Sequence, residues 1–144
     1  MTPADQDSLE AYRSLVSRGL ADTLGIEMVE LTPERCVATM PVDERTRQPF
    51  GILHGGASVA LAETAVSLGA WLNIDRERFA AVGLEINANH IRAKRDGVVR
   101  ATATPVHRGR TTQVWAVEIT DEEGRLVCVS RCTIAVVPLA GATA

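Results

Sequence analysis

The sequence has few cysteines, few aromatic residues and no excess of positive charge. Its three cysteines are an odd number without a CxxC or Cys/His spacing, so we predict neither a disulfide framework nor a structural metal. We expect Cys36, Cys128 and Cys132 to be buried as small apolar side chains in strands. Two Trp, two Phe and one Tyr are too few for a base-stacking surface. A net charge of −3 likewise argues against a nucleic-acid partner.

A long uninterrupted apolar run is also missing. The longest candidate, residues 52–72, is broken by His54, Glu63, Thr64 and Ser67, which favours a buried helix over a membrane span. No basic segment followed by an apolar stretch opens the chain, so we expect no secretory signal, no membrane partner and a cytoplasmic protein. A length of 144 residues fits one domain, 1–144.

Hydrophobic periodicity predicts two helices and about six strands. A first helix is expected at about 8–18, where Asp7 and Glu10 resemble a capping box. The second, Gly55–Leu72, is apolar on nearly every side and must therefore be enclosed. The predicted strands are Ile26–Leu31, Cys36–Val42, Leu84–Arg92, Val98–Val106, Thr111–Thr120 and Leu126–Val137.

Short polar turns separate the last four strands, which predicts antiparallel neighbours. Within Thr111–Thr120, Trp115, Val117 and Ile119 share one face. One enclosed helix with such strands indicates an α+β domain, in which an antiparallel sheet wraps around a long central helix. We expect its core over about 20–137. A dimer that packs two of these helices together would complete their burial.

The start of the central helix is a candidate anion or carbonyl site. Gly55 and Gly56 allow close approach to the main chain, and free N–H groups point outward there. Such donors can stabilise an oxyanion. The alternative is a glycine turn that leads into a tightly packed helix.

Glu63 is a more specific signal, because it is the only ionisable residue between His54 and Asp75. Burial of a lone carboxylate is costly unless something compensates for it. Ser67, four residues on, shares its helix face and can hydrogen-bond the same water or substrate. Together these groups suggest attack on a carbonyl. The alternative is a glutamate that reaches solvent or pairs with a buried arginine.

Two further polar residues precede this helix. His54 is either a general base or a residue that orients the turn, and Gln48 suits holding a carbonyl or a water. No GxSxG motif supports a serine hydrolase. His54, His90 and His107 share no ligand spacing, so no metal site is predicted.

Basic residues cluster near two strand ends. One group is His90, Arg92, Lys94 and Arg95, and the other is His107, Arg108 and Arg110. If their strands were hairpin partners, the groups would lie at opposite ends of the hairpin, although they could converge across a dimer. They are either solvated turn residues or a site for phosphate groups.

The pattern Gln48, His54-Gly55-Gly56, Glu63 and Ser67 resembles the hotdog-fold acyl-CoA thioesterases. It is most similar to the branch of the Arthrobacter-type 4-hydroxybenzoyl-CoA thioesterase, which includes the bacterial thioesterases of menaquinone and enterobactin metabolism. The likeness covers about 20–137. It implies a hotdog fold, active sites at subunit interfaces and a homotetramer built as a dimer of dimers.

The resemblance also implies roles for individual residues. Glu63 would attack the thioester carbon or activate water, and Ser67 would position that water. The Gly55 N–H would polarise the carbonyl, assisted by His54 and Gln48. Coenzyme A, part of the substrate rather than a separate cofactor, would lie along Gly83, His90, Arg92, His107, Gly109, Arg110 and Thr111. The acyl pocket would include Leu68, Trp71 and Val82, each of which is otherwise plain core.

The sequence therefore predicts hydrolysis of an acyl-CoA to free acid and coenzyme A, without a metal or organic cofactor. An aromatic or hydroxyaromatic acyl group is favoured, and a medium aliphatic chain is next. Both roles of Glu63 need an ionised carboxylate, so we expect hydrogen-bond donors near it. The alternatives are a non-catalytic acyl-CoA-binding protein, a thioesterase for acyl-carrier-protein, and, less favoured, a hydratase or dehydratase.

Overall fold

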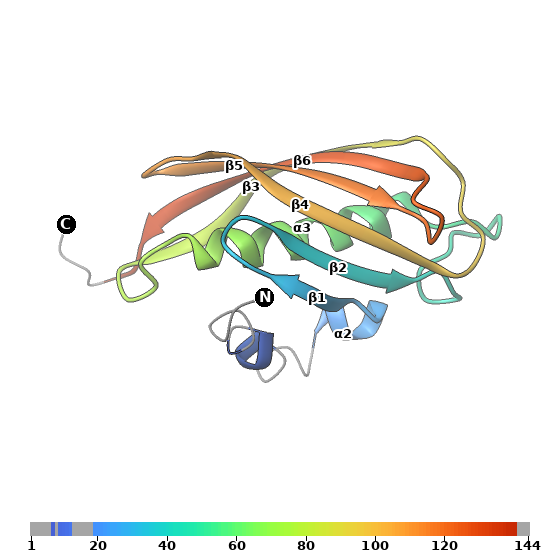
Figure 1. The fold of residues 1–144 in the computed structure, drawn as a ribbon, viewed down its shortest axis with the longest axis horizontal. Helices are drawn as coiled ribbons and strands as arrows, with labels where there is room; N and C mark the ends of the chain where they lie inside the picture. The colour runs from blue at the N-terminus through green and yellow to red at the C-terminus, as the bar shows by residue number, and fades with distance from the viewer. Residues whose placement is uncertain (1–6, 8, 13–18, 141–144) are drawn as a thin grey trace.

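In a computed structural model, which describes residue 7, residues 9–12 and residues 19–140, one long helix lies in the concave face of an antiparallel sheet (Figure 1). The elements follow the chain as α2 (Leu20–Leu24), β1 (Glu27–Leu31), β2 (Cys36–Pro41), α3 (Gly55–Leu72), β3 (Phe79–His90), β4 (Val98–Arg108), β5 (Thr112–Thr120) and β6 (Leu126–Pro138). This arrangement confirms the predicted α+β architecture, and it is that of a hotdog fold.

The sheet has six strands in the order β1-β2-β4-β5-β6-β3, and every neighbouring pair is antiparallel. Within the described residues, the 12-residue β3 forms one edge of the sheet and pairs only with β6, from Phe79 opposite Pro138 to His90 opposite Cys128. The prediction that β3 and β4 are neighbours is therefore wrong. The segment 91–97 instead carries the chain from the β3 edge to β4, which pairs with β2 and β5.

The central helix begins and ends at the predicted residues, 55 and 72. Its C-terminus is closed by Asn73, whose Nδ2 donates to Gly69 O at 2.8 Å and to Pro33 O at 2.8 Å. Small residues on its buried side let the sheet approach closely. A Cβ atom on Gly69 would lie 2.6 Å from Cη2 of Trp115, so the indole occupies the space that a side chain would need.

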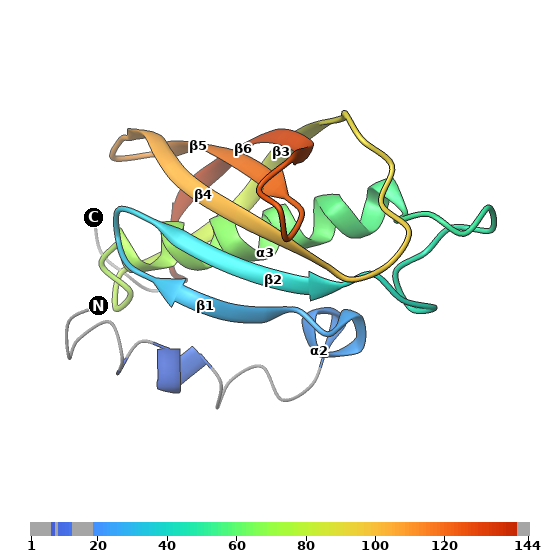
Figure 2. The same ribbon diagram turned by 45° about the vertical axis from the view of Figure 1, so that its right-hand side comes forward.

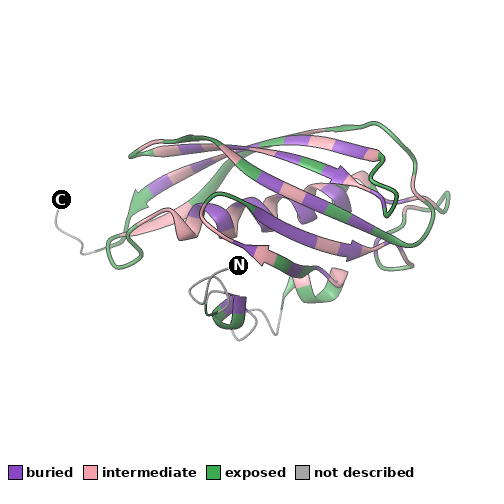
Figure 3. Cartoon of the chain, in the orientation of Figure 1, coloured by how far each residue is buried: buried purple, intermediate pink, exposed green. Residues whose placement is uncertain are grey.

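The core lies between α3 and the sheet (Figure 3). Trp115, Val117 and Ile119 are at most 1% exposed, which confirms the predicted inward face of β5. The buried polar groups next to Trp115 are paired: its Nε1 donates to Gln113 Oε1 at 3.0 Å, and Gln113 Nε2 donates to Ala70 O. All three cysteines are buried and free, as predicted.

The remaining differences concern element boundaries. β3 begins at Phe79 rather than Leu84, while the other strands match within two residues. Residues 9–12 are helical, but most of the predicted helix 8–18 lies outside the described residues. The sequence reading did not predict α2, which ends at Gly25 in the left-handed conformation (φ 68°). Beside β1, α2 packs onto α3 (Figure 2).

Candidate active site

The first turn of α3 leaves one main-chain donor free. Nδ1 of His54 accepts from Gly56 N at 2.8 Å, and His54 O accepts from Ala57 N at 3.0 Å and Ser58 N at 3.3 Å. The imidazole thus orients the turn, which was one of its two predicted roles. Within the described part of the chain, no acceptor meets the N–H of Gly55. That N–H is available to polarise a carbonyl oxygen.

The imidazole of His90 lies beside Gly55, at the place that a side chain on this residue would occupy. A Cβ atom on Gly55 would lie 2.7 Å from His90 Nε2 and 3.1 Å from Cε1, so a side chain at position 55 would require the ring to shift. Around this contact lies a pocket of about 320 Å³, here called the Gly55 pocket, whose lining includes Gln48, Gly55, His90, Ile91, Arg92 and Val127. It unites two predicted carbonyl-binding residues with two predicted coenzyme A contacts.

Gln48 is held in place by its own loop. Its side-chain Oε1 accepts from Phe50 N, and its backbone N–H donates to Ile52 O at 2.8 Å. No described residue accepts from the side-chain amide of Gln48, so that NH₂ group can donate into the Gly55 pocket.

Two long-range hydrogen bonds connect the loop 47–53, which contains Gln48, to the segment 91–97. Leu53 N donates to Lys94 O at 2.7 Å, and Arg47 Nε donates to Arg95 O at 2.6 Å. These bonds fix Gln48 relative to the strand end that carries His90.

Glu63 lies half-buried on α3 and faces β3. Its Oε1 is 2.7 Å from the position that a Cβ atom on Gly83 would occupy. None of the described residues forms an ion pair or a hydrogen bond with this carboxylate, so the expected donors near Glu63 are not found in the described chain. The charge of Glu63 also affects Cys132. Burial is the largest cause that raises the pKa of the Cys132 thiol to about 11, and the negative charges of Glu63 and Glu85 add to it.

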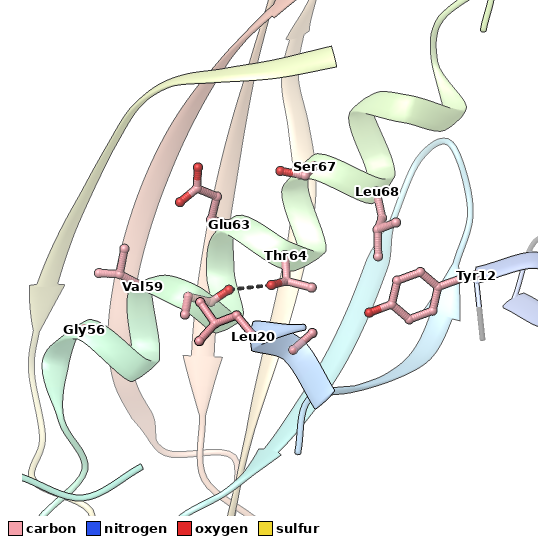
Figure 4. Close-up of a pocket in the computed structure, with 10 residues that line it drawn as sticks. Tyr12, Leu20, Gly56, Val59, Glu63, Thr64, Ser67 and Leu68 are labelled. Carbon is pink, nitrogen blue, oxygen red and sulfur yellow. Dashed lines mark hydrogen bonds between the residues drawn. The ribbon is translucent and has the colours of Figure 1, made fainter. Parts of the chain in front are cut away.

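A pocket of about 590 Å³ opens beside Glu63, here called the Glu63 pocket (Figure 4). Glu63 and Ser67 point their oxygens to the same side of α3, as their spacing predicts. Thr64 is engaged, because its hydroxyl donates to Ala60 O at 2.7 Å. Ser67 has no such partner among the described residues, which leaves its hydroxyl available for water or substrate.

The predicted catalytic residues are thus split between pockets of one chain. Gly55 and Glu63 are eight residues apart, roughly 12 Å along the helix axis. Gln48 and Gly55 line one pocket, whereas Glu63 and Ser67 line another. His54 lines a third cavity of about 280 Å³.

The two basic clusters lie at opposite ends of the sheet. Through the strand register, Arg108 aligns with Gly83, near the start of β3, while His90 aligns with Ala101, near the start of β4. His107, Gly109, Arg110 and Thr111 are therefore far from the Gly55 pocket in the same chain. Gly83, predicted to contact coenzyme A, lies against the Glu63 carboxylate.

Of the three predicted acyl-pocket residues, only Leu68 lines the Glu63 pocket. Trp71 lies under the guanidinium of Arg76, whose Cζ is 4.3 Å from the ring centroid. Val82 is 46% exposed on the edge strand β3. Tyr12 also lines the Glu63 pocket, although the sequence analysis did not identify it as a site residue.

No helix in the described part of the chain is long and apolar enough to cross a membrane. Among the described residues, no group of three or more His, Cys, Asp or Glu side chains is placed to hold a metal ion.

Comparison with known proteins agrees with this fold. The family model of the Thioesterase superfamily matches residues 50–128, which include Gly55 and Glu63. ComA2 of Bacillus subtilis is 64% identical over 118 residues, 82% of this chain and 94% of that protein. The 1,4-dihydroxy-2-naphthoyl-CoA hydrolase of Listeria monocytogenes is 52% identical over 82% of this chain and 95% of its own length. A crystal structure of mutant thioesterase PA1618 from Pseudomonas aeruginosa superposes with a TM-score of 0.88 at 46% identity, covering 91% of this chain and 94% of that chain.

The antiparallel sheet wrapped around one long helix, together with the family match, defines a thioesterase of the hotdog fold. The chain belongs to the thioesterase superfamily. It is a thioester hydrolase, and its relatives link it to acyl-CoA substrates in general.

Proposed function

We propose that the protein hydrolyses an aromatic acyl-CoA, with Glu63 as the catalytic carboxylate and the Gly55 N–H as the oxyanion donor. The observation that carries this proposal is the environment of the Glu63 side chain. It is a half-buried carboxylate on an apolar helix, it lines a pocket beside Ser67, and no described side chain neutralises it. An ionised carboxylate in that position can attack the thioester carbon or take a proton from an attacking water. Direct attack forms an acyl–Glu63 anhydride that water then hydrolyses, whereas general-base catalysis adds the water to the carbonyl carbon directly. In both routes the C–S bond breaks, the departing coenzyme A thiolate takes up a proton, and the free acid is released.

The unpaired edge of β3 supports a site shared between two subunits. This edge strand is 12 residues long, and Leu84 on it is 63% exposed. Long exposed edges of this kind tend to pair with another strand. We propose that β3 pairs with the partner's β3 around a two-fold axis. The Glu63 carboxylate, which lies against Gly83 on that strand, would then face the partner. Assembly of two dimers into a homotetramer remains part of this proposal.

Such a dimer would combine the two separate groups of candidate catalytic residues into one site. Glu63 and Ser67 of one subunit would act on a thioester whose carbonyl is held by Gly55 and Gln48 of the partner subunit. Antiparallel pairing of the two β3 strands would also bring the partner's His90 toward the sheet end that carries His107–Thr111. We propose that the two basic clusters bind coenzyme A phosphates together across the interface.

Two observations favour an aromatic acyl group. The Glu63 pocket is large enough for a ring system and includes Leu68 and Val59 in its lining. In addition, relatives from Listeria monocytogenes and Escherichia coli, 52% and 48% identical, are named 1,4-dihydroxy-2-naphthoyl-CoA hydrolases. We therefore propose that this chain belongs to the same branch as the 4-hydroxybenzoyl-CoA thioesterases that its motif resembles.

The test is thiol release from a panel of aromatic and aliphatic acyl-CoAs by wild type, Glu63→Gln and Glu77→Gln. Glu77 is an exposed carboxylate in the turn before β3 and serves as the matched control. We expect aromatic esters to be the best substrates. Glu63→Gln should lose nearly all turnover while it stays folded, and Glu77→Gln should keep it. Full activity of Glu63→Gln would overturn the site assignment, and a preference for aliphatic esters would overturn the substrate class.

A further inference from the structure

Tyr12 carries a buried hydroxyl that nothing in the described structure satisfies. The residue is only 6% exposed, and its Oη has no hydrogen-bond partner among the described residues. Buried hydroxyl groups are nearly always paired, because burial of an unpaired one is unfavourable. An orphaned hydroxyl at the wall of a cavity therefore indicates a missing partner in that cavity.

The hydroxyl belongs to the Glu63 pocket. Tyr12 comes from the N-terminal segment and lies across from Leu68, with its Oη directed at α3 (Figure 4). Thr64 cannot serve as its donor, because that hydroxyl already donates to Ala60 O. Glu63 and Ser67 point away from Tyr12. The pocket therefore has one end with the candidate catalytic groups and an opposite end with the unpaired hydroxyl of Tyr12.

We propose that Tyr12 is a specificity-determining residue that hydrogen-bonds a hydroxyl group on the acyl ring of the substrate, at the end remote from the thioester. This rests on the proposed function, because it takes the Glu63 side of the pocket as the place of the thioester. Leu68 and Thr64, which lie between Glu63 and Tyr12, would contact the faces of the ring. The favoured substrate class is thus a hydroxyaryl-CoA rather than its unsubstituted counterpart.

The chemistry of Tyr12 suits this role. Burial raises the pKa of its phenol above the ordinary 10, so the group is neutral at physiological pH. A neutral phenol can both donate to and accept from a substrate hydroxyl. A site built to hydrogen-bond a substrate hydroxyl discriminates against the analogue that lacks it, because its own polar group is then left unpaired.

The experiment compares wild type with Tyr12→Phe, which removes only the hydroxyl. For both proteins kcat/KM is measured with benzoyl-CoA and with 3- and 4-hydroxybenzoyl-CoA, a matched set that differs in one oxygen. We expect Tyr12→Phe to lower kcat/KM about tenfold for at least one hydroxylated ester, as loss of one neutral hydrogen bond predicts, and to leave benzoyl-CoA unchanged. Its melting temperature should equal or exceed that of wild type, because the orphaned hydroxyl is gone.

An equal effect on all three esters, or none on any, would show that Tyr12 only packs against α3 and would overturn the proposal. A second measurement keeps this test independent of turnover. Binding of the same esters is measured calorimetrically with Glu63→Gln and with Glu63→Gln/Tyr12→Phe. If wild type hydrolyses none of the esters, the proposed function fails. In that case the proposal for Tyr12 is still supported if Glu63→Gln binds the hydroxylated esters more tightly than benzoyl-CoA and the added Tyr12→Phe substitution abolishes this preference. The proposal is overturned if Glu63→Gln shows no such preference.

Discussion

The carboxylate of Glu63 rests against the backbone of Gly83, with Oε1 2.7 Å from the point where a side chain would begin. The strand β3 therefore supports the candidate catalytic group by having no side chain at this position. A bulge in the β3–β6 register falls between Gly83 and Glu85, next to the same contact. Helix and edge strand together define where the carboxylate points.

Replacement of Gly83 by alanine should move the carboxylate and spare the fold. The added methyl group meets the end of a flexible, half-buried side chain, which can turn away at little cost in stability. A displacement of about 1 Å at a reacting group can cost about a hundredfold in rate. We expect Gly83→Ala to lose between tenfold and a hundredfold in kcat for thiol release, with a melting temperature close to wild type.

The double variant Gly83→Ala/Glu63→Gln serves as control. If the methyl group acts through the carboxylate, it should add nothing once that carboxylate has been removed. Full activity of Gly83→Ala would show that catalysis does not depend on a glycine beside the Glu63 carboxylate.

Gly69→Ala should have the opposite outcome, a loss of stability. Its Cβ atom would lie 2.6 Å from Cη2 of Trp115 and 2.8 Å from Sγ of Cys36, both fully buried and unable to yield. Overpacking of this kind costs about 1–3 kcal/mol, whereas alanine gains about 1 kcal/mol in helix propensity. We expect a net decrease in the free energy of unfolding, measured by denaturant titration. The substitution should be better tolerated in a Trp115→Phe background, and strictly additive effects would contradict the contact.

The secondary structure was largely predictable because local signals agree with it. The glycine pair and the dense apolar composition define α3, and alternation defines β5 and its buried Trp115. The start of β3 was missed because Ala80, Ala81 and Gly83 are small residues that do not show the alternation of a half-buried strand. Pairing of β3 with β6 was missed because a short linker usually joins neighbouring strands, whereas here it runs from the edge strand β3 to β4 in the interior of the sheet.

The candidate site was predictable as a set of residues, but not as an arrangement. Glu63 stands out because it is charged on an apolar helix. Its contact with Gly83, and that of His90 with Gly55, join residues far apart in sequence that share no motif. Tyr12 could not be identified from the sequence, because no motif marks it and only the structure shows that its hydroxyl is buried without a partner among the described residues.

The cysteines should be unreactive in the folded protein. Burial raises the pKa of the Cys36 thiol to about 12, and burial with the charges of Glu63 and Glu85 raises that of Cys132 to about 11. The thiolate is the reactive form, so at pH 8 a disulfide reagent should label these two thiols only after unfolding. Both pKa values exceed the unfolded value of 9, so their contribution to stability should be lost as the pH rises from 9 through 11 and 12. Fast labelling of native protein at pH 8 would contradict this burial.

Glu122 should make the protein more sensitive to acid. Its hydrogen bond from Lys94 Nζ, and then that from Val98 N at 2.6 Å, lower its pKa from the usual 4.5 to about 2. A folded-state pKa below the unfolded value stabilises the fold above pH 4.5, and this contribution is lost as the pH falls from 4.5 to 2. Glu122→Gln should therefore lower the free energy of unfolding at pH 7, and its difference from wild type should shrink towards zero near pH 2.

The neighbouring Glu123 provides the control for the effect of Glu122. It is also exposed on the β5–β6 turn, where its Oε2 pairs with Arg125 Nη1 at 2.9 Å, and its carboxylate accepts from no backbone N–H of another strand in the described part of the chain. Exposed ion pairs contribute little. Glu123→Gln should therefore change stability less than Glu122→Gln at pH 7. Denaturant titrations of both variants and wild type between pH 2 and pH 7 measure the difference.

Because Lys94 O accepts from Leu53 N, loss of the Glu122 contact should also loosen the segment 91–97 next to the Gly55 pocket. Faster hydrogen exchange at 91–97 in Glu122→Gln alone would support this link, and equal exchange in both variants would contradict it.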